Sequence, residues 1–495
     1  MSVTSERCAD KMLLPKNQRG AALMLLLLVI IVGGLAFYLS VVDPLKYQNR
    51  RQRSTQQALA EAKRSLIGFA LTSYRNDAER YGFLPCPDLN TFGSEGAMDN
   101  GPTHCGQTNI TKIGRLPWYS LLMDLTTDEN SECLWYVVSG NYKRANKGAL
   151  LNQDTPGMLQ VFASDGATML LGATPADRPV AAVISVGRPM AGQQRYAEPG
   201  GRTPVCGGNY DAANYLESVG GINNADENAA VNQIHRIVSG STQNLAINDV
   251  VLPIYRQEIF DVLVNSQQFT LAINGLMNDI AACLVRFGNA HVNNALPWAA
   301  PIAMTAVDDY ASNSKYDDEN SRYFGRLPYQ INDSGSGLLA LLEDSNCGVG
   351  GVSEANKQLY DDWKDHFFYI VAHAKAPPVP VNCTAANCLQ YQDDAALRNY
   401  SAVLLFAGPR HANVAPRIAG APDAGDGKAD IMQYLESANF SNYNGGDYSA
   451  SLFGNVPALP GVPGDAARVY NDMAICIEYD SVNSVYLSVP NCGVP

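Results

Sequence analysis

Apolar side chains run without interruption near the start of the chain. Residues 21–42 contain no charged side chain over 22 positions. A helix rises about 1.5 Å per residue, so this stretch can cross the roughly 30 Å hydrocarbon core of a bilayer. We therefore predict a membrane-spanning helix over residues 21–43. The alternative is a cleavable secretory signal, whose apolar core usually spans about 7 to 15 residues and ends in small residues. Residues 35–38, Leu-Ala-Phe-Tyr, supply no such ending.

A second helical pattern follows Asp43-Pro44 and extends to Arg75. Its charged positions, among them Glu61, Lys63 and Arg64, fall on the side opposite the apolar ones. The predicted buried side comprises Thr55, Leu59, Ala62, Leu66, Phe69, Ala70 and Ser73. We predict an amphipathic helix that continues the apolar one.

Loops and strands alternate after this helix. Residues 82–88 and 114–118 contain proline, which cannot donate to a central strand, so we predict ordered loops there. Residues 134–138 and 180–186 are rich in β-branched and aromatic side chains, which indicates buried strands.

The second half of the chain repeats landmarks of the first half in the same order. Residues 269–287 match the first amphipathic helix, and Leu296-Pro297-Trp298 stands where Leu84-Pro85-Cys86 stood. The remaining matches pair residues 325–329 with 114–118, 367–371 with 134–138, 402–410 with 182–189, and 434–437 with 215–218. Six landmarks in one order predict two tandem modules.

The predicted fold class is α+β, with an N-terminal transmembrane helix that continues into an amphipathic helix and is followed by two tandem α+β modules with antiparallel sheets. The predicted segments are a basic leader (1–20), the transmembrane helix (21–43), a first module (44–260) and a second module (261–495). We expect the modules to join near residues 258–268. Only the first module has a membrane helix, so we expect the second module to be carried by the first.

Composition supports an ordered, loop-rich ectodomain beyond the apolar helix. Charged residues make up 17% and hydrophobic residues 46% of the chain, which also contains 42 Gly and 27 Pro. This balance argues against disorder. The net charge of -13 argues against nucleic acid as a partner.

Cysteine usage indicates an oxidising compartment. Of 11 cysteines, only Cys8 precedes the apolar helix, and an even number follows it. The disulfide candidates are Cys86, Cys105, Cys133, Cys206, Cys283, Cys347, Cys383, Cys388, Cys476 and Cys492. Neighbouring pairs (86 with 105, 383 with 388, 476 with 492) close the shortest loops, but the sequence leaves connectivity open. Reduced thiols in a cytosolic protein are the alternative, and no C-x-x-C pair suggests zinc.

The sequence lacks the common catalytic, metal-binding and phosphate-binding motifs. The six histidines form no H-E-x-x-H, and neither a nucleophile elbow nor a phosphate loop occurs, so we expect no enzyme and no catalytic residue. We expect His366 and His373 to flank a core strand. Calcium is the one cofactor considered, with Asp423, Asp426 and Asp430 as weak candidate ligands. Because the EF-hand spacing is missing, a solvated acidic surface is the alternative.

The junction Arg19-Gly20, set directly against the apolar run, resembles the prepilin peptidase site of type IV pilins and pseudopilins. The resemblance implies cleavage between Gly20 and Ala21 and an apolar helix that later packs inside a filament. Most family members carry glutamate where this chain has Leu25, and those without it include the large minor pseudopilin at the tip of the secretion pseudopilus.

The succession Leu-Pro-Cys-Pro, Gly-Arg-Leu-Pro-Trp and Leu-Trp-Tyr-x-Val-Ser extends the resemblance over about residues 17–260, to large bacterial pilin-like proteins. The resemblance implies pilin-like modules and, as partners, other pilin or pseudopilin subunits, prepilin peptidase and the bacterial inner membrane. The ectodomain is then periplasmic, or exported on a filament.

Two functions follow as expectations. The first is a non-enzymatic minor pilin or pseudopilin-like subunit that initiates or caps a type IV pilus or type II secretion filament. The second is a signal-anchored periplasmic or surface binding protein, such as an adhesin, that uses exposed aromatics like those of residues 443–448.

Overall fold

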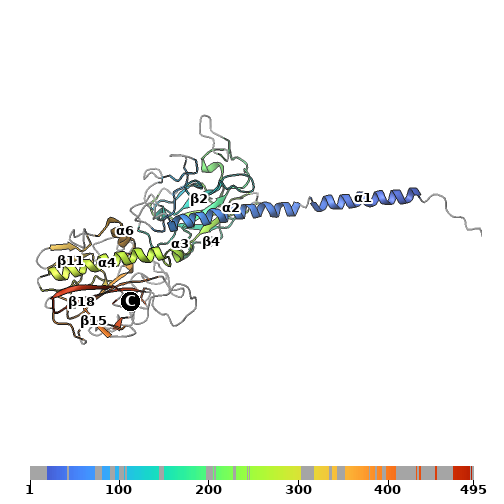
Figure 1. Ribbon diagram of the computed structural model, residues 1–495. Coiled ribbons are helices and arrows are strands. Elements are labelled where there is room, and N and C mark those ends of the chain that lie inside the picture. The colour runs from blue at the N-terminus through green and yellow to red at the C-terminus, as the bar shows by residue number, and fades with distance from the viewer. Residues whose placement is uncertain are drawn as a thin grey trace, which may run out of the picture. The chain divides into compact units, whose positions relative to one another are not determined.

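The structure is a computed structural model whose chain groups into two compact units, residues 1–57 and residues 58–495 (Figure 1). We describe each unit by itself and call the second the head. The described residues are 19–41, 44–72, 81–89, 95–99, 105, 109–143, 150–196, 205, 208–226, 230–241, 244, 246–291, 293–302, 317–333, 337–342, 352–377, 380–384, 387–392, 397–408, 431, 434–435, 452–453, 472–490 and 492.

The first unit contains helix α1 (Arg19–Val41) and the start of helix α2 (Pro44–Thr72). Between Leu23 and Leu35 the large apolar side chains of α1 are 54% to 78% exposed. The helix α1 has 23 residues, which at about 1.5 Å per residue matches the roughly 30 Å hydrocarbon core of a bilayer. Among the described helices, α4 (Gln267–Ala290) passes a length and hydropathy test for crossing a membrane, but 44% of the tested window is buried within the head.

The C-terminal part of α2 supplies one side of the head's core. Ala58, Leu59, Ala62, Leu66 and Ala70 are buried together at helical spacing, and Glu61 and Arg64 face solvent. The predicted amphipathic pattern is present over the described part of this helix except at Lys63, whose side chain is 18% exposed and donates to the Pro253 carbonyl at 2.8 Å. Ser73 lies outside the described residues.

The first half of the head has three layers. The middle layer is an antiparallel sheet in the order β1 (Lys112–Arg115), β2 (Trp135–Val138), β5 (Ala181–Ser185), β9 (Val250–Ile254). Leu134, Tyr136 and Val138 belong to the same core cluster as α2, while Trp135 and Val137 belong to the cluster on the opposite face. That face is covered by a small sheet of β4 (Met169–Leu171), β3 (Leu159–Phe162) and β8 (His235–Val238), in which β3 and β8 run parallel.

The second half has the same three layers. Helix α4 packs on an antiparallel sheet in the order β10 (Phe324–Arg326), β13 (Phe367–Val371), β16 (Ala402–Phe406), β18 (Met473–Asp480), β19 (Val485–Pro490). Its small sheet contains β15 (Leu397–Tyr400), β14 (Leu389–Gln392) and β17 (Leu452–Phe453), with β14 and β17 parallel. The fold is therefore α+β with antiparallel main sheets, as predicted.

Shorter elements connect these layers. They are the strands β6 (Ser218–Val219), β7 (Ile222–Asn223), β11 (Gln330–Asp333) and β12 (Gly337–Ala340), the helices α3 (Arg256–Leu263) and α6 (Glu354–Trp363), and the 3-10 turns η2 (Gly140–Tyr142), η3 (Pro175–Asp177), η4 (Ala212–Asn214) and η6 (Lys364–His366).

Strand pairing aligns the two halves residue by residue. Arg115 pairs with Trp135 as Arg326 pairs with Phe368, and the next strand begins at Ala181 in one half and Ala402 in the other. The sequence match had placed Ala402 on Ala182, one residue too far along. The same register puts the buried Asp472 on the buried Asp249, a landmark that the sequence comparison overlooked.

The predicted junction near residues 258–268 is part of the core. Helix α3 and the start of α4 occupy it, and Ile259, Phe260 and Leu263 are buried. Because residues 58–495 form one compact unit, the second half is packed against the first, and the module bounds 44–260 and 261–495 stay a prediction.

His235, at the start of β8, is a buried histidine whose pKa differs between the folded and the unfolded chain. It is 2% exposed, and burial lowers the pKa of its imidazole to about 4, with Asp226 opposing the shift in part. An unfolded histidine titrates near pH 6.5, so the unfolded chain binds the extra proton first as the pH falls.

We predict that the free energy of unfolding falls between about pH 6.5 and about pH 4, with His235 contributing up to about 3 kcal/mol. Denaturant unfolding at several pH values measures this loss. His235→Gln should be flatter than the wild type over this window, whereas His373→Gln, at an exposed histidine in the second half, should keep the wild-type slope. Equal slopes for wild type and His235→Gln would contradict the assignment.

Candidate functional site

Two segments of the head that are 211 residues apart in sequence meet through buried hydrogen bonds. The backbone N–H of Leu151 donates to Asp362 Oδ1 at 3.2 Å. The side-chain amide of Asn152 donates to the Asp362 carbonyl at 2.9 Å and to Asp365 Oδ1 at 3.0 Å. We call this contact between residues 150–154 and 362–366 the joint.

Local structure explains why the second segment points inward. Helix α6 starts at Ser353, whose hydroxyl accepts the N–H of Asn356 at 3.1 Å, as a good N-cap does. It ends at Trp363 and tightens into η6 before β13 begins. The tight turn places Asp365 and His366 in the core, where both are 0% exposed.

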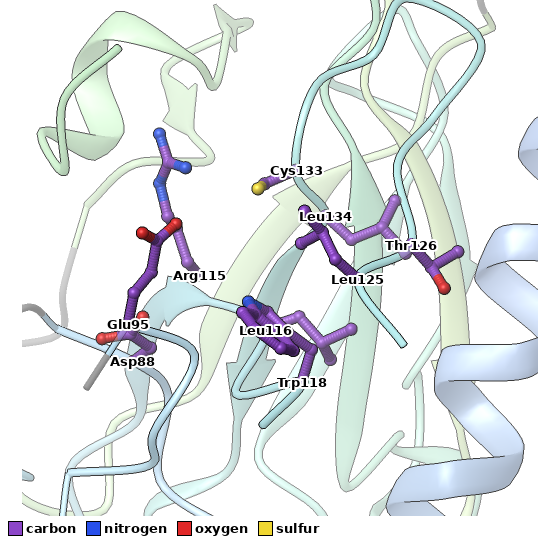
Figure 2. Close-up of a pocket in the computed structure, with 9 residues that line it drawn as sticks. All are labelled: Asp88, Glu95, Arg115, Leu116, Trp118, Leu125, Thr126, Cys133 and Leu134. Carbon is purple, nitrogen blue, oxygen red and sulfur yellow. The ribbon is translucent and has the colours of Figure 1, made fainter. Parts of the chain in front are cut away.

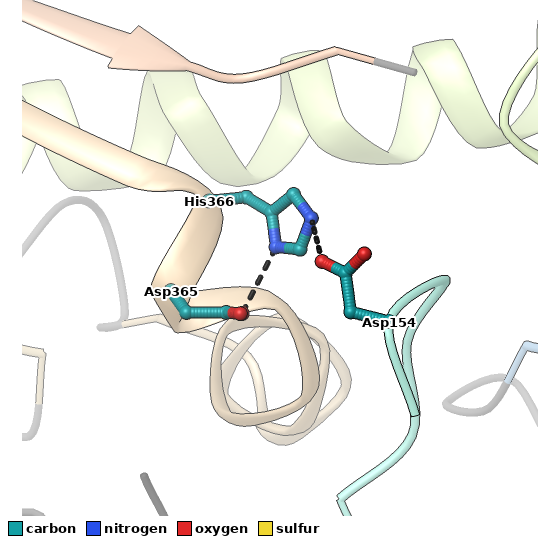
Figure 3. A group of neighbouring side chains, drawn as sticks. All are labelled: Asp154, Asp365 and His366. Atoms are coloured by element: carbon teal, nitrogen blue, oxygen red, sulfur yellow. Dashed lines mark hydrogen bonds and ion pairs between the residues drawn. The ribbon is translucent and has the colours of Figure 1, made fainter. Parts of the chain in front are cut away.

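His366 lies between two carboxylates at the joint (Figure 3). Its Nδ1 is 2.9 Å from Asp365 Oδ1, and its Nε2 is 3.2 Å from Asp154 Oδ2. Asp365 also accepts the hydroxyl of Tyr434 on Oδ2 at 3.1 Å. The three side chains are at most 1% exposed, so the cluster is sealed from solvent.

Cations and aromatic rings surround this cluster. Arg256 donates to the carbonyl of Asp154 at 3.1 Å, and Arg326 donates to the carbonyl of Asp365. Burial lowers the pKa of the Lys364 ammonium, and the neighbouring Asp361, Asp365 and Asp362 oppose that shift. The ring of Trp363 lies 4.9 Å from that of His366, which completes a dry shell.

The same three residue types also fit a metal ion, because one ligand atom from each lies within 4.8 Å of the others. The ring of His366, however, presents its two nitrogens to different carboxylates, so one ion can use Nε2 with Asp154 or Nδ1 with Asp365, but not both. A structural zinc site needs four ligands, and the carboxylate on the other ring nitrogen would be an outer partner. The geometry fits a buried polar contact between two segments better than a metal centre.

A shared arginine contact explains two of the repeated sequence landmarks. Arg115, in the first Gly-Arg-Leu-Pro, donates to the Tyr215 hydroxyl at 3.1 Å and lies 5.2 Å from its ring centre. Arg326, in the second, lies 4.6 Å from the ring centre of Tyr434. In each half, the arginine of the Gly-Arg-Leu-Pro landmark therefore contacts the tyrosine of the Tyr-Leu-Glu-Ser landmark.

A small cavity lies beside Arg115 (Figure 2). It measures about 10 Å³, which is room for one water molecule. Its lining residues are Asp88, Glu95, Arg115, Leu116, Trp118, Leu125, Thr126, Cys133 and Leu134. Asp88 Oδ2 accepts the N–H of Gly96 at 2.8 Å and the hydroxyl of Tyr210 at 3.1 Å. The cavity is therefore too small for a substrate, and its Asp88 carboxylate already has hydrogen bonds within the protein.

A buried acid pair lies elsewhere in the first half. Asp249 Oδ2 accepts the N–H of Glu217 at 3.0 Å, and Glu217 Oε2 accepts the N–H of Asp249 at 3.0 Å. Burial first, and then the charge of Glu217, raise the pKa of Asp249 well above its usual value. Asn224 donates to the same Asp249 oxygen at 2.8 Å, so the pair is a buried structural network.

Six of the disulfide candidates are bonded in the three neighbouring pairs. Cys86–Cys105, Cys383–Cys388 and Cys476–Cys492 are bonded, with Cα separations of 6.0, 5.4 and 4.8 Å. Cys133 and Cys283 are also disulfide-bonded. Cys206 and Cys347 lie outside the described residues.

The other predicted sites are only partly described. Gly20 and Ala21 lie within α1. The calcium candidates Asp423, Asp426 and Asp430 lie outside the described residues, as do the aromatics of residues 443–448. His366 and His373 flank strand β13, as expected from the sequence.

Sequence reasoning missed Asp154 and Asp365 as partners of His366. Residues 152–157, Asn-Gln-Asp-Thr-Pro-Gly, have the composition of an exposed turn. The one usable signal was the placement of Asp365-His366 directly before a wholly apolar strand, which favours burial of both.

Comparison of the chain with protein-family models, with curated proteins and with solved structures gives no match.

Gly82 tests how tightly the core around Phe260 is packed. It has a φ of +83°, and a Cβ at this position would lie 2.6 Å from Cζ of Phe260. Phe260 is 1% exposed and is held between Tyr142 and Trp363, at ring separations of 6.5 and 6.1 Å. The ring therefore has no room to move aside.

We predict that Gly82→Ala lowers the free energy of unfolding by about 2 to 4 kcal/mol, because backbone strain and overpacking add. Gly221→Ala is the matched control, since Gly221 has a φ of +78° and a Cβ added there would have nothing within 4 Å. It should lose only about 1 kcal/mol. Equal losses in denaturant unfolding would show that Phe260 can yield.

Proposed function

We propose that this chain is a membrane-anchored, non-enzymatic subunit of a pilin-like filament, of the minor pilin or pseudopilin kind. The observation that carries the proposal is α1, an apolar helix with exposed leucines that begins at Arg19-Gly20. Exposed apolar surface of this extent is stable only in lipid or against other apolar helices. A bilayer and then a filament core provide these two environments in turn.

The path of the chain supports the same proposal. Helix α2 follows α1 and buries Leu59, Ala62 and Leu66 in an α+β head with antiparallel sheets. An apolar helix followed by an amphipathic helix under a sheet is the arrangement that the resemblance to pilins implies. The proposed location is the bacterial inner membrane, with a periplasmic head.

The buried joint favours a structural role for the head. A catalytic group must reach its substrate, yet His366 and Asp365 are 0% exposed and Asp154 is 2% exposed. The cavity beside Arg115 holds no more than a water molecule. Side chains of this kind hold a fold together, as a filament subunit requires.

The size of the head and the identity of residue 25 favour the filament end. A compact unit of this length has a radius of gyration of about 22 Å, which a closely stacked shaft does not accommodate easily. Leu25 also leaves the apolar helix without a carboxylate to pair with a neighbouring subunit. We infer that the subunit initiates or caps assembly.

A signal-anchored binding protein, such as an adhesin, is the second candidate. The loop after β1 favours it, because Tyr119 is 58% exposed and Leu122 is 94% exposed. Exposed aromatic and aliphatic side chains on a loop suit contact with another surface.

Processing of the leader separates the two functions. We predict that protein extracted from membranes of cells with active prepilin peptidase has the intact mass of a chain beginning at Ala21. The same chain from cells without the peptidase should keep its leader, and Gly20→Val should keep it in both, because a branched side chain fills the space at the cut bond. A wild-type chain that still carries residues 1–20 in the presence of the peptidase would leave the anchored binding protein as the better account.

A further inference from the structure

Glu217, directly before β6, has a carboxyl group that accepts hydrogen bonds on both oxygens. Oε1 accepts the side-chain amide of Gln193 at 2.9 Å, and Oε2 accepts the N–H groups of Asn248 and Asp249 at 3.0 Å each. The amide of Gln193 cannot be turned round, because its own oxygen accepts the N–H of Met190 at 2.8 Å. Glu217 therefore accepts three N–H groups, as an ionised carboxylate does.

Asp249, directly before β9, makes a different set of contacts. Its Oδ2 accepts the N–H of Glu217 at 3.0 Å and the side-chain amide of Asn224 at 2.8 Å. The amide of Asn224 is also fixed in orientation, because its oxygen accepts the N–H of Val238 and its nitrogen donates to the Val238 carbonyl. Within the described part of the chain, no N–H or O–H donor reaches the buried Oδ1 of Asp249.

The two acidic side chains are also hydrogen-bonded to each other, and they are 0% and 7% exposed for Asp249 and Glu217. Two ionised carboxylates have no proton to share in such a bond, and Oδ1 would then hold an unpaired buried charge. Oδ1 accepts no N–H, so it is the oxygen best placed to carry a proton. Burial first, and the charge of Glu217 second, raise the pKa of Asp249 well above its usual value, in agreement with this placement.

Neighbouring charges do not replace this proton. The titratable side chains on the surrounding elements are Asp128, Glu132, Arg188, Arg195, Tyr215, Asp226, His235 and Arg236. Among the described contacts, neither carboxyl group accepts a hydrogen bond from Arg188, Arg195 or Arg236, and Arg195 pairs with Glu132 at 3.2 Å. Calcium takes about six to eight oxygen ligands, and three of the four carboxyl oxygens already accept N–H groups, so a proton fits Oδ1 better than a metal ion does.

We propose that Asp249 keeps its proton in the folded head and donates it to an ionised Glu217, which makes the pair a proton-dependent lock between two sheets. Asp249 leads into β9 of the main sheet, and Asn224 binds both Asp249 and Val238 of β8 in the small sheet. Loss of the proton would leave two adjacent carboxylates in a dry site, where their repulsion is strong.

The lock stabilises the fold at low pH. An unfolded aspartate releases its proton near pH 4, whereas the folded Asp249 still binds it above that pH. The contribution of the lock is therefore complete below about pH 4 and is lost as the pH rises through the raised pKa of the folded Asp249. This direction is opposite to that of His235.

Denaturant unfolding of the full chain in detergent micelles from about pH 5 to about pH 7 tests the lock. Asp249→Asn places an N–H where the O–H is proposed, and this N–H does not titrate. The unfolding equilibrium constant of the wild type, divided by that of Asp249→Asn, should rise about tenfold per pH unit, because the folded wild type binds one more proton than the unfolded chain. His235 titrates in both proteins, so its effect cancels in the ratio.

Glu217→Gln and Asp128→Asn are the matched controls, because both carboxyl groups accept donors on each oxygen. Asp128 accepts two backbone N–H groups on Oδ1, and a backbone N–H and the Ser185 hydroxyl on Oδ2. An amide at either position turns an N–H towards another donor. Each control should therefore raise the unfolding constant about tenfold or more at pH 7, whereas Asp249→Asn should be at least as stable as the wild type.

A ratio for Asp249→Asn that does not change with pH overturns the proposal. So does a Glu217→Gln variant as stable as the wild type at pH 7, which would place the proton on Glu217. Calcium that stabilises the wild type but not Asp249→Asn would also overturn it, by assigning Oδ1 to a cation. If Asp249→Asn does not fold, proton release by the wild type decides: unfolding near pH 7 should release about one proton per chain, and no release overturns the proposal.

Discussion

Each main sheet of the head has a face that must be covered by a helix, and this requirement shapes the rest of the molecule. Helix α2 covers the first sheet and α4 covers the second, and both helix-side cores belong to one hydrophobic cluster. Phe269 of α4 lies 4.8 Å from Trp363 and 5.5 Å from Tyr81 by ring centres, so aromatic side chains carry the core across the joint. The halves share a core, so neither has a complete interior alone.

This shared core gives the polar cluster its importance. Buried charges contribute little net stability, but they cost a great deal when one partner moves away. Within an aromatic shell, the bonds from Asn152 to Asp362 and Asp365 are satisfied in one relative position of the halves. The apolar contacts thus supply the attraction, and the polar contacts select the geometry.

The sequence predicted what depends on local pattern. Periodicity and composition predicted the buried side of α2, the buried strands β2 and β13, and the repeated landmarks, because those features depend on a few neighbouring residues. The register slip at Ala402 arose because a run of small and apolar residues matches itself equally well one step along; only strand pairing resolves it. The sequence placed the junction near residues 258–268 but gave no sign that Phe260 is buried there between Tyr142 of the first half and Trp363 of the second. The partners of His366 were out of reach because Asp154 belongs to a turn-like segment over two hundred residues away, and no local rule links the two.

The central claim is that residues 58–495 form one cooperative body built from two repeats. Differential scanning calorimetry of the full chain in detergent micelles tests it directly. We expect one unfolding transition whose calorimetric and van't Hoff enthalpies agree, because loss of either half exposes the shared core of the other. Two separate transitions, each with its own enthalpy, would contradict it and show that the halves fold independently.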